Sequence, residues 1–502
     1  SCWQTLWSCR SFSVAASVYK LMATDDKYDR QLRLWGAHGQ KALMEAKVCI
    51  LGSSPCATET LKNLVLPGIG QFVVVDAAHV EDADLGNNFF LDAEDVGKPR
   101  AEAVCRCLQE LNPDVKGSSI VKNITEVLDA GKSFFSPYSL VIACQLTEPQ
   151  ALKVVAACEE LSIGLVLITS IGFIGKLRLY TKEHAMVETK PDSDLGDLRL
   201  TDPFPELQRF AESCDLSALD AAEHAHVPYV LILLKGLEEF RRVCPEKHLP
   251  TSREDKEHFK KIIAGMQWSP QEGNFSEALE NAYKAWVPYR IPDEVLEVLR
   301  LETAGEREDF WVVARAVAQF VRDCGKLPLA GTLPDMTAST EMYMKLQEIY
   351  SSRADGDIAA ISAHVATILK EQGMSRSISQ EFITRFCKNS MYCEVLKLRS
   401  FADEFQPSAS EEGGLDLAME CEDEDSLIQW YIALRAADRV RQDTGSWPGA
   451  NCLDDDAALA TQLRTMEQVA AEVVASYEAE GAAADSRMLQ ELVRYGGSEL
   501  HV

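Results

Sequence analysis

Residues 47–76 constrain the fold of this chain more than any other segment. They contain, in order, an apolar run, a short turn, a helical segment, a second apolar run and an acid, Asp76. This is the order of a βαβ unit of the nucleotide-binding type, and such units build parallel sheets with helices on both faces. Further apolar runs alternate with helical segments as far as Tyr180. The first part of the chain is therefore expected to be an α/β domain around a parallel-rich sheet.

The turn of this unit lacks the glycines that phosphate binding requires. A G-x-G-x-x-G turn lets the backbone approach a phosphate and lets the helix pack closely on the strand. Residues 52–57 read GSSPCA, so only Gly52 is present, and Pro55 has no N–H to offer an anion. The βαβ order indicates a nucleotide-binding type of fold, whereas the sequence of the turn predicts that this chain does not itself bind phosphates.

Hydrophobic periodicity predicts the elements of this domain and a change of class after it. Residues 27–46 are expected to form an arm followed by a helix. The expected strands are 48–51, 72–75, 140–143, 165–169 and 174–179, and the expected helices are 58–65, 99–111 and 148–161. From about residue 181 the apolar residues recur at helical spacing, which predicts a large, mainly α-helical region without a fixed repeat.

Four segments follow from these patterns. Residues 1–21 carry no acid and lead into Met22-Ala23-Thr24-Asp25-Asp26, which resembles a translation start, so we expect residues 1–24 to be a non-native extension, with an organellar transit peptide as the alternative. Residues 25–180 are the expected α/β domain, with a Rossmann-like topology. Residues 181–485 are the expected helical insertion, in which the acidic stretch 408–425 is expected to be a loop. Residues 486–502 are expected to start a return to the first domain and to stop short of completing it.

Composition excludes several classes of function. The net charge of −28 opposes nucleic-acid binding, which needs clustered Lys and Arg to neutralise phosphates. No run approaches the ~18 apolar residues of a membrane span. The 15 cysteines include no C-x-x-C pair, so we expect reduced, metal-free thiols in an intracellular protein.

Three motifs together resemble the activating enzymes of ubiquitin-like proteins. They are the arm KYDRQLRLWG at 27–36, the βαβ unit, and GNNFF at 86–90. Further segments resemble the regulatory, non-catalytic subunits of the neddylation activating enzyme, which include the auxin-resistance proteins of plants. These segments are LKNLVLPGIG at 61–70, DLRLTDPFPEL at 197–207, GTLPDM at 331–336 and ELVRYG at 491–496. The resemblance implies two paired adenylation half-domains crossed by helical insertions.

The resemblance also implies how such enzymes divide their chemistry. The catalytic half binds ATP and magnesium, joins AMP to the C-terminal carboxylate of the modifier, and then takes the acyl group on a cysteine as a thioester. In-line attack on an α-phosphate requires neutralised phosphates, a held magnesium ion and an oriented nucleotide. Each requirement can be compared with the matching position of this chain.

Most of these positions lack the required group. An Asp after the second strand holds the ribose in active members, and Asp76 matches it. The segment that supplies an arginine to the phosphates reads NNFF at 87–90, and Gln145 replaces the Asp that holds magnesium. A neutral amide is a poor replacement for a carboxylate on magnesium. Lys98, with Arg100 as an alternative, matches a lysine that contacts phosphate. The residues expected to be vestiges of a site that binds neither nucleotide nor metal are Gly52, Asp76 and Lys98.

Arg30 in the arm is the residue with an expected catalytic role. In these enzymes the arm arginine of one half reaches in trans into the nucleotide site of the partner. There a planar, permanently charged fork meets the terminal phosphates. The alternative is a salt bridge within the arm, for example to Asp29.

No cysteine stands in the P-x-C-T-like context of the thioester cysteine. Cys214, Cys244 and Cys393 lie in the expected insertion, and each is expected to be a buried or incidental thiol.

The chain is thus expected to be a regulatory subunit, not catalytic alone, of a heterodimeric enzyme that activates a Nedd-type modifier for cullin neddylation. Its expected partners are the catalytic subunit, which carries ATP and magnesium, the ubiquitin-like modifier, and a conjugating enzyme further along the pathway. Neither nucleic acid nor a membrane is an expected partner. A cytoplasmic location is expected, with the nucleus as a second one.

Alternative functions remain open. One is a self-sufficient adenylating homodimer of the sulfur-carrier type, and another is the regulatory subunit of the sumoylation activating enzyme. An NAD-dependent oxidoreductase is opposed by the turn at 52–57 and by the lack of a catalytic His or Tyr-Lys pairing.

Overall fold

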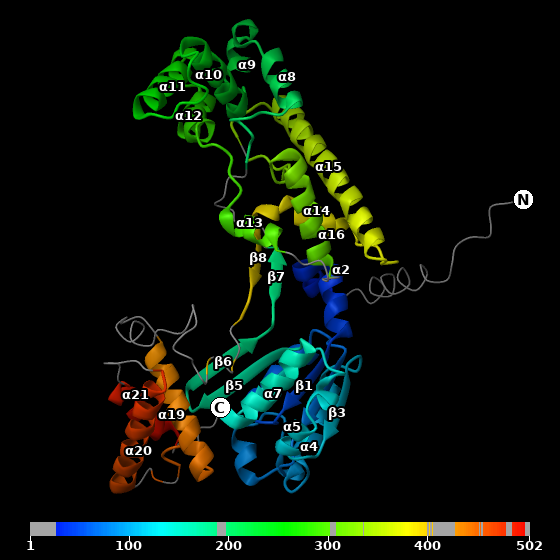
Figure 1. Ribbon diagram of the computed structural model, residues 1–502, viewed down its shortest axis with the longest axis vertical. Coiled ribbons are helices and arrows are strands. Elements are labelled where there is room, and N and C mark those ends of the chain that lie inside the picture. The colour runs from blue at the N-terminus through cyan, green and yellow to red at the C-terminus, as the bar shows by residue number, and fades with distance from the viewer. Residues whose placement is uncertain are drawn as a thin grey trace, which may run out of the picture. The chain divides into compact units, whose positions relative to one another are not determined.

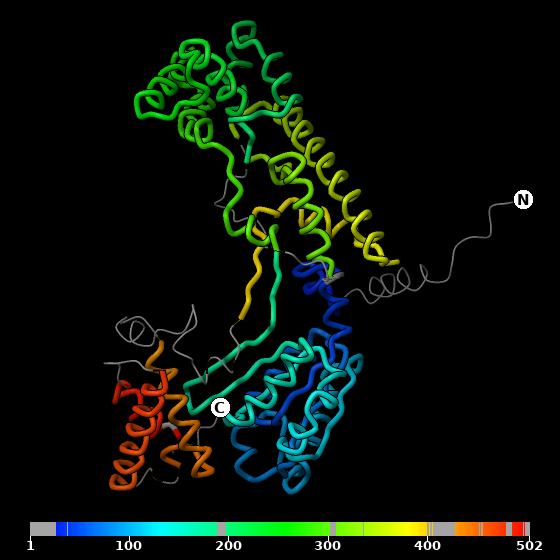
Figure 2. Tube along the Cα trace, in the orientation of Figure 1, coloured from blue at the N-terminus to red at the C-terminus, as the bar shows by residue number. Residues whose placement is uncertain are grey.

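The computed structural model describes residues 27–187, 197–301, 308–398 and 427–496, apart from residues 335, 451, 453, 454 and 478–483, together with residues 401 and 404. The chain forms two compact units. One combines the chain up to Glu183 with the chain from Lys397 onward, and the other runs from His184 to Leu396 (Figure 1, Figure 2). The segments expected to be an extension, 1–24, and an acidic loop, 408–425, lie outside the described residues, as do residues 497–502.

The first unit is built on a six-stranded sheet in the order β3-β2-β1-β4-β5-β6. Neighbouring strands from β3 to β5 are parallel, and β6 is antiparallel to β5. The strands are β1 Lys47–Leu51, β2 Gln71–Val75, β3 Lys116–Ile120, β4 Leu140–Cys144, β5 Gly164–Ile171 and β6 Ile174–Tyr180. The predicted parallel-rich sheet is confirmed. Strand β3 has no predicted counterpart because its sequence, KGSSI, is polar, as an exposed edge strand allows.

Helices cover both faces of this sheet, as the sequence predicts. Val48 and Ile50 of β1 share one core with α3 and α4, whereas Cys49 and Leu51 share another with α5, α6 and α7. This alternation follows from the two-residue repeat of a strand. The helices and 3-10 turns of this part are α2 Asp29–Glu45, α3 Pro55–Val65, η1 Asp82–Gly86, η2 Ala93–Asp95, α4 Arg100–Leu111, α5 Ile124–Asp129, α6 Lys132–Phe135 and α7 Glu148–Leu161.

Three further helices also belong to the first unit. They are α19 Ile428–Thr444, α20 Asp456–Ala475 and α21 Ser486–Gly496, and they lie side by side (Figure 1). Their apolar faces enclose a core together with Ile171 at the end of β5. The predicted insertion, 181–485, includes α19 and α20, whereas the structure ends the second unit at Leu396. Helical periodicity reveals an apolar face but not the core that this face covers, which explains the difference.

The second unit is almost entirely helical in its described part. β7 His184–Val187 and β8 Cys393–Leu396 pair in antiparallel fashion where the chain enters and leaves it. Its other elements are α8 Pro205–Ser213, η3 Leu216–Ala218, α9 Ala221–His224, α10 Tyr229–Val243, α11 Arg253–Met266, α12 Gly273–Glu280, η4 Ala282–Ala285, α13 Asp293–Arg300, α14 Asp309–Cys324, α15 Thr340–Glu371, α16 Gln380–Lys388 and η5 Ser390–Tyr392.

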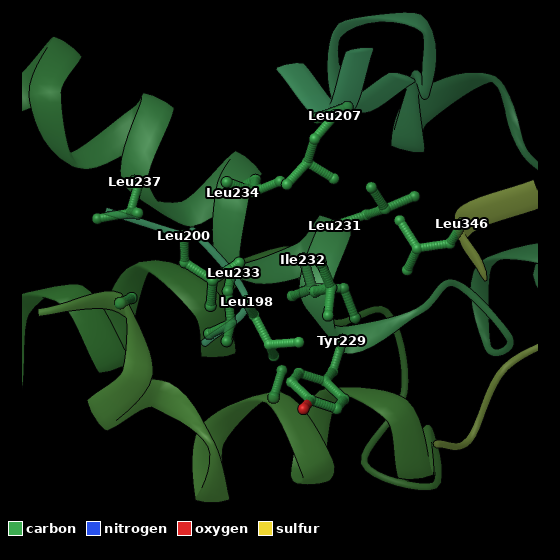
Figure 3. Packing of buried hydrophobic residues seen from close by; sticks show 14 of the residues in the cluster. Leu198, Leu200, Leu207, Tyr229, Leu231, Ile232, Leu233, Leu234, Leu237 and Leu346 are labelled. Atoms are coloured by element: carbon green, nitrogen blue, oxygen red, sulfur yellow. The ribbon is translucent and has the colours of Figure 1, made fainter. Parts of the chain in front are cut away.

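The 32-residue helix α15 joins two cores of this unit. The first core surrounds α10, and Leu231 of α10 and Leu346 of α15 point toward one another within it (Figure 3). The second core surrounds α14 and takes in the later turns of α15. The buried apolar residues of α15 recur at spacings of three or four along one face and are Leu346, Tyr350, Ala354, Ile358, Ile361, Val365 and Leu369. None of the described helices, α15 included, carries an apolar stretch that would span a bilayer.

Candidate functional site

The candidate site lies at the carboxyl edge of the sheet in the first unit. Strand β1 pairs in register with β2 on one side and with β4 on the other, so the segments that follow these strands lie beside one another. These segments begin at Gly52, Asp76 and Gln145. Ligands of open α/β sheets bind at this edge, outside the carboxyl ends of the strands.

Gly52 has a structural role in the turn after β1. Its φ of +91° suits glycine, and a Cβ built there would lie 3.3 Å from the carbonyl oxygen of Cys144. The Gly52 N–H donates to the carbonyl of Val75 at 2.8 Å. The one glycine that survives from the phosphate-binding pattern therefore serves the close packing of neighbouring strands.

The carboxylate of Asp76 is filled by donors from this chain. Its Oδ2 accepts hydrogen bonds from the Ser53 N–H at 3.1 Å, from the Ser53 hydroxyl, and from Arg100 Nε and Nη2 at 3.1 and 2.9 Å. Its Oδ1 accepts from the Ala78 N–H at 2.9 Å. Arg100 Nη1 donates to Asp84 at 2.9 Å. Asp76 is only 7% exposed. Both of its oxygens are thus engaged, and a ribose hydroxyl would have to displace one of these donors.

Burial and charge act in opposite directions on this pair. Burial alone would raise the pKa of the Asp76 carboxyl, but the charge of Arg100 and the Ser53 hydrogen bond outweigh it, so that this pKa lies below its ordinary value. Burial would likewise lower the pKa of Arg100, and Asp76 more than offsets that effect. Asp76 and Arg100 are therefore ionised together, and each satisfies the charge of the other.

The NNFF segment is also tied into the turn. Asn88 is buried, and its side-chain oxygen accepts from the Thr58 hydroxyl at 3.3 Å and from the Phe90 N–H at 3.2 Å. Its amide nitrogen donates to the carbonyl of Ser53 at 3.4 Å. At the position where the resemblance implies an arginine for the phosphates, this chain has a neutral amide that fixes its own loop.

Lys98 lies in a different ion pair from the Asp76 cluster. Its Nζ meets Asp95 at 3.1 Å, and Asp95 also accepts from Arg106 at 2.8 Å. Of the two basic residues offered by the sequence for phosphate contact, the structure brings Arg100, and not Lys98, to Asp76. That cation is already committed to Asp76 and Asp84.

Gln145 clamps two neighbouring strands. It has a left-handed backbone, with φ +58°, and its amide nitrogen donates to the carbonyl of Ser170 in β5 at 2.8 Å. Its amide oxygen accepts from the Ser170 N–H at 3.2 Å, and its own carbonyl accepts from Arg441 of α19 at 2.8 Å. Both ends of the amide are engaged in this clamp. Together with the committed Asp76, this means that the residues present do not fit ATP with magnesium.

Replacing Gln145 with glutamate is expected to weaken the clamp without creating a magnesium site. The isosteric carboxylate keeps an acceptor for the Ser170 N–H but loses the donor to the Ser170 carbonyl, which costs about 1–3 kcal/mol of local stability. Hydrogen exchange of the β4 and β5 amides measures this loss, and calorimetric titration should show no binding of ATP with magnesium. Gln150→Glu is the matched control, because the Gln150 oxygen that accepts from the Thr147 N–H is retained. Binding of ATP by the Gln145 variant would contradict the interpretation.

Arg30 lies in the first turn of α2 and is exposed. The alternative of a salt bridge to Asp29 is not what the structure shows, because Asp29 pairs with Arg33 at 3.0 Å. Within the described part of the chain, Arg30 has no hydrogen bond or ion pair. Its guanidinium is therefore available to another protein, as a residue that acts in trans must be.

None of the three cysteines considered for thioester formation has an activated setting. Burial raises the pKa of Cys214, and it raises that of Cys393 to about 11. The Cys244 sulfur lies 3.9 Å from His258 Nδ1, at the outer limit of a hydrogen bond to sulfur. Across the described residues, no group of three or more His, Cys, Asp and Glu side chains is arranged to hold a metal ion.

Sequence reasoning missed the partners that close the site. Asp84 belongs to an acidic stretch, EDADLG, which gives no sign that it faces Arg100. Arg441 lies almost three hundred positions from Gln145 in sequence. The loss of required groups was visible as missing residue types, whereas the interactions that replaced them are long-range and were not.

Comparisons with known proteins identify the family. Residues 28–269 match the ThiF family. NEDD8-activating enzyme E1 regulatory subunit AXL of Arabidopsis thaliana is 40% identical, with 95% of this chain and 91% of that protein covered. NEDD8-activating enzyme E1 regulatory subunit AXR1 of the same plant is 39% identical, with 95% and 88% covered. The NEDD8-activating enzyme E1 regulatory subunit of Danio rerio is 38% identical, with 85% and 82% covered. The resemblance drawn from the motifs is confirmed: this chain belongs to the family of NEDD8-activating enzyme E1 regulatory subunits.

Proposed function

We propose that this chain is the non-catalytic subunit of a heterodimer that activates a NEDD8-type modifier. Family membership supports this function, and one observation supports the division of labour: the Asp76 carboxylate, which a nucleotide would need, is filled by Ser53 and Arg100. The catalytic partner would bind ATP and magnesium, adenylate the modifier and carry the thioester. A conjugating enzyme would then receive the modifier. We also propose that this protein is located in the cytoplasm and in the nucleus.

The contribution of this chain to the reaction would come from Arg30. An exposed arginine at the start of α2 can enter the nucleotide site of the partner and place two donors on the terminal phosphates. Such a group stabilises the charge that develops in phosphoryl and nucleotidyl transfer. The other residues of the candidate site in this chain hold the sheet edge together and need not contact a nucleotide.

Reconstitution tests the proposal directly. The chain is co-expressed with a NEDD8-activating catalytic subunit, and ATP–pyrophosphate exchange is measured for each protein alone and for the complex. We expect a stable complex, exchange that depends on the NEDD8-type modifier, and no exchange by this chain alone. A chain that forms an acyl-adenylate unaided would favour the self-sufficient homodimer, and a response to a SUMO-type modifier in place of NEDD8 would favour the sumoylation alternative.

A further inference from the structure

The helix that carries Arg30, α2, has a sharp break in its middle. Gly36 has a φ of +69° and a ψ of 175°, a backbone conformation that is open almost only to glycine. The break ends the arm, residues 27–36, and separates its helical part from residues 37–45, which lead into β1 (Figure 1). The direction of the arm, and with it the position of Arg30, therefore depends on the contacts on either side of the break.

Tyr28 fixes the start of the arm. Its ring is buried, and its hydroxyl accepts a hydrogen bond from Asn112 Nδ2 at 3.0 Å. Asn112 is fully buried, and the same nitrogen donates to the carbonyl of Val65 at 2.9 Å. A Cβ built on Gly68 would lie 2.6 Å from the Tyr28 hydroxyl oxygen, so the ring occupies space that a side chain at position 68 would need. The Tyr28 carbonyl accepts from the Leu32 N–H at 2.9 Å, which joins this buried anchor to the first turn of the helix.

Trp35 and Gln40 fix the other end of the arm. Trp35 Nε1 donates to the Gln40 side-chain oxygen at 3.0 Å, and Gln40 Nε2 donates to the carbonyl of Pro67 at 2.8 Å. Gln40 is fully buried, so its amide is held in place by the surrounding packing as well as by these two bonds. The Trp35–Gln40 bond bridges the break at Gly36, because it ties the arm to the second part of α2.

Both anchors meet the same loop, residues 66–70, which joins α3 to β2. Pro67 accepts the hydrogen bond from Gln40, and Gly68 borders the hydroxyl of Tyr28. One loop of the first unit therefore supports the arm at its start and at its end.

We propose that Tyr28, Trp35 and Gln40 are positioning residues, which with this loop hold the arm so that Arg30 is presented to the partner before the two subunits meet. The inference rests on the role in trans proposed above for Arg30. Within the described residues Arg30 has no hydrogen bond or ion pair of its own, so its position depends on the backbone that carries it. A charge assists a transition state only when it is held close to the productive geometry, and a loose arm would lose conformational entropy on entering the site.

Hydrogen exchange of the free chain tests whether these contacts hold the arm. Gln40→Met keeps much of the side-chain length but removes both hydrogen bonds, and Tyr28→Ala removes the buried ring. In each variant the amides of residues 32–35 are expected to exchange at least about tenfold faster. Circular dichroism confirms that each variant is folded.

A double-variant cycle in the reconstituted heterodimer tests whether the contacts act through Arg30. ATP–pyrophosphate exchange at saturating ATP and modifier should fall by about tenfold or more in Gln40→Met and in Gly36→Ala. Nothing lies within 4 Å of a Cβ built on Gly36, so the second variant disturbs the backbone of the break without a steric clash. In an Arg30→Ala background the same changes should cost less than about twofold, because no guanidinium is left to misplace. A merely structural role would give the same loss in both backgrounds.

Matched substitutions elsewhere in the chain provide the controls. Gln109→Met removes the hydrogen bond from the Gln109 side chain to the Gly117 carbonyl, at 3.1 Å on α4. Gly356→Ala adds a Cβ in open space within α15. Both variants should leave the rate of pyrophosphate exchange and the protection of the arm amides unchanged.

Two results would overturn the inference. Unchanged exchange of amides 32–35 in both Gln40→Met and Tyr28→Ala would show that these contacts do not hold the arm. Equal losses of rate with and without Arg30 would show that they do not act through this residue. A normal rate in the Arg30→Ala complex, combined with faster exchange of the arm amides in Gln40→Met, would instead contradict the proposed role of Arg30, because the arm would be held without serving the reaction.

Discussion

Replacing Arg30 with alanine is expected to slow modifier adenylation by about 10²-fold or more while the heterodimer stays intact. Arg30 is exposed at the start of α2, and in the described part of the chain it has no partner that its loss would disturb. In a partner site that excludes water, its charge is worth far more to the transition state than a surface charge. ATP–pyrophosphate exchange by the purified complex, at saturating modifier, measures the effect.

Two neighbouring changes separate this role from a general charge effect. Arg33→Ala removes a cation three positions away whose only described partner is Asp29, and both side chains are largely exposed. That variant should exchange pyrophosphate at close to the normal rate, because exposed pairs contribute little. Arg30→Lys keeps the charge and loses the planar fork, so its rate should fall between those of Arg30 and alanine. An unchanged rate in the Arg30→Ala complex would remove this residue from the mechanism.

The sheet of the first unit could be predicted because its signals are local. Each buried strand is a short apolar run, and the connections from β1 to β5 return through helices, so the βαβ order of residues 47–76 determines the direction of these parallel strands. The edge strand β3 was not predicted because its exposed and half-exposed positions carry Lys and Ser, which give no apolar pattern. Membership of α19 and α20 in this unit escaped for a different reason: it depends on contacts such as that of Arg441 with Gln145, far apart in sequence.

The candidate site divides in the same way. The absence of glycines, of an arginine in NNFF and of an acid at Gln145 is written in the residue types, and each absence removes a function by elementary chemistry. The residue types do not show which interactions replace the missing groups. Arg100 was one of two candidates for phosphate contact, and only the fold shows that it pairs with Asp76 while Lys98 pairs with Asp95.

Arg100→Met is expected to lower the local stability of the first unit by about 3–5 kcal/mol, because it strands a buried charge. Asp76 is 7% exposed and receives two of its hydrogen bonds from Arg100. Methionine keeps much of the side-chain volume, so the change isolates the charge and its hydrogen bonds. The chain forms two compact units, and multi-domain proteins do not in general unfold in one transition, so hydrogen exchange of the β1 and β2 amides is the suitable measurement.

A second arginine on α4 provides the matched control for this prediction. Arg106→Met also removes a partner from a buried acid, Asp95, but Lys98 still donates to that carboxylate at 3.1 Å, so the effect should be much smaller. Combining Arg100→Met with Asp76→Asn removes both charges, and the Asn oxygen can still accept from the Ser53 N–H. The double variant should therefore lose less than the sum of the single variants by at least about 1 kcal/mol. Additive effects would show that Asp76 and Arg100 do not stabilise each other. They would contradict the interpretation that residues at the position of a nucleotide site now stabilise this edge of the sheet.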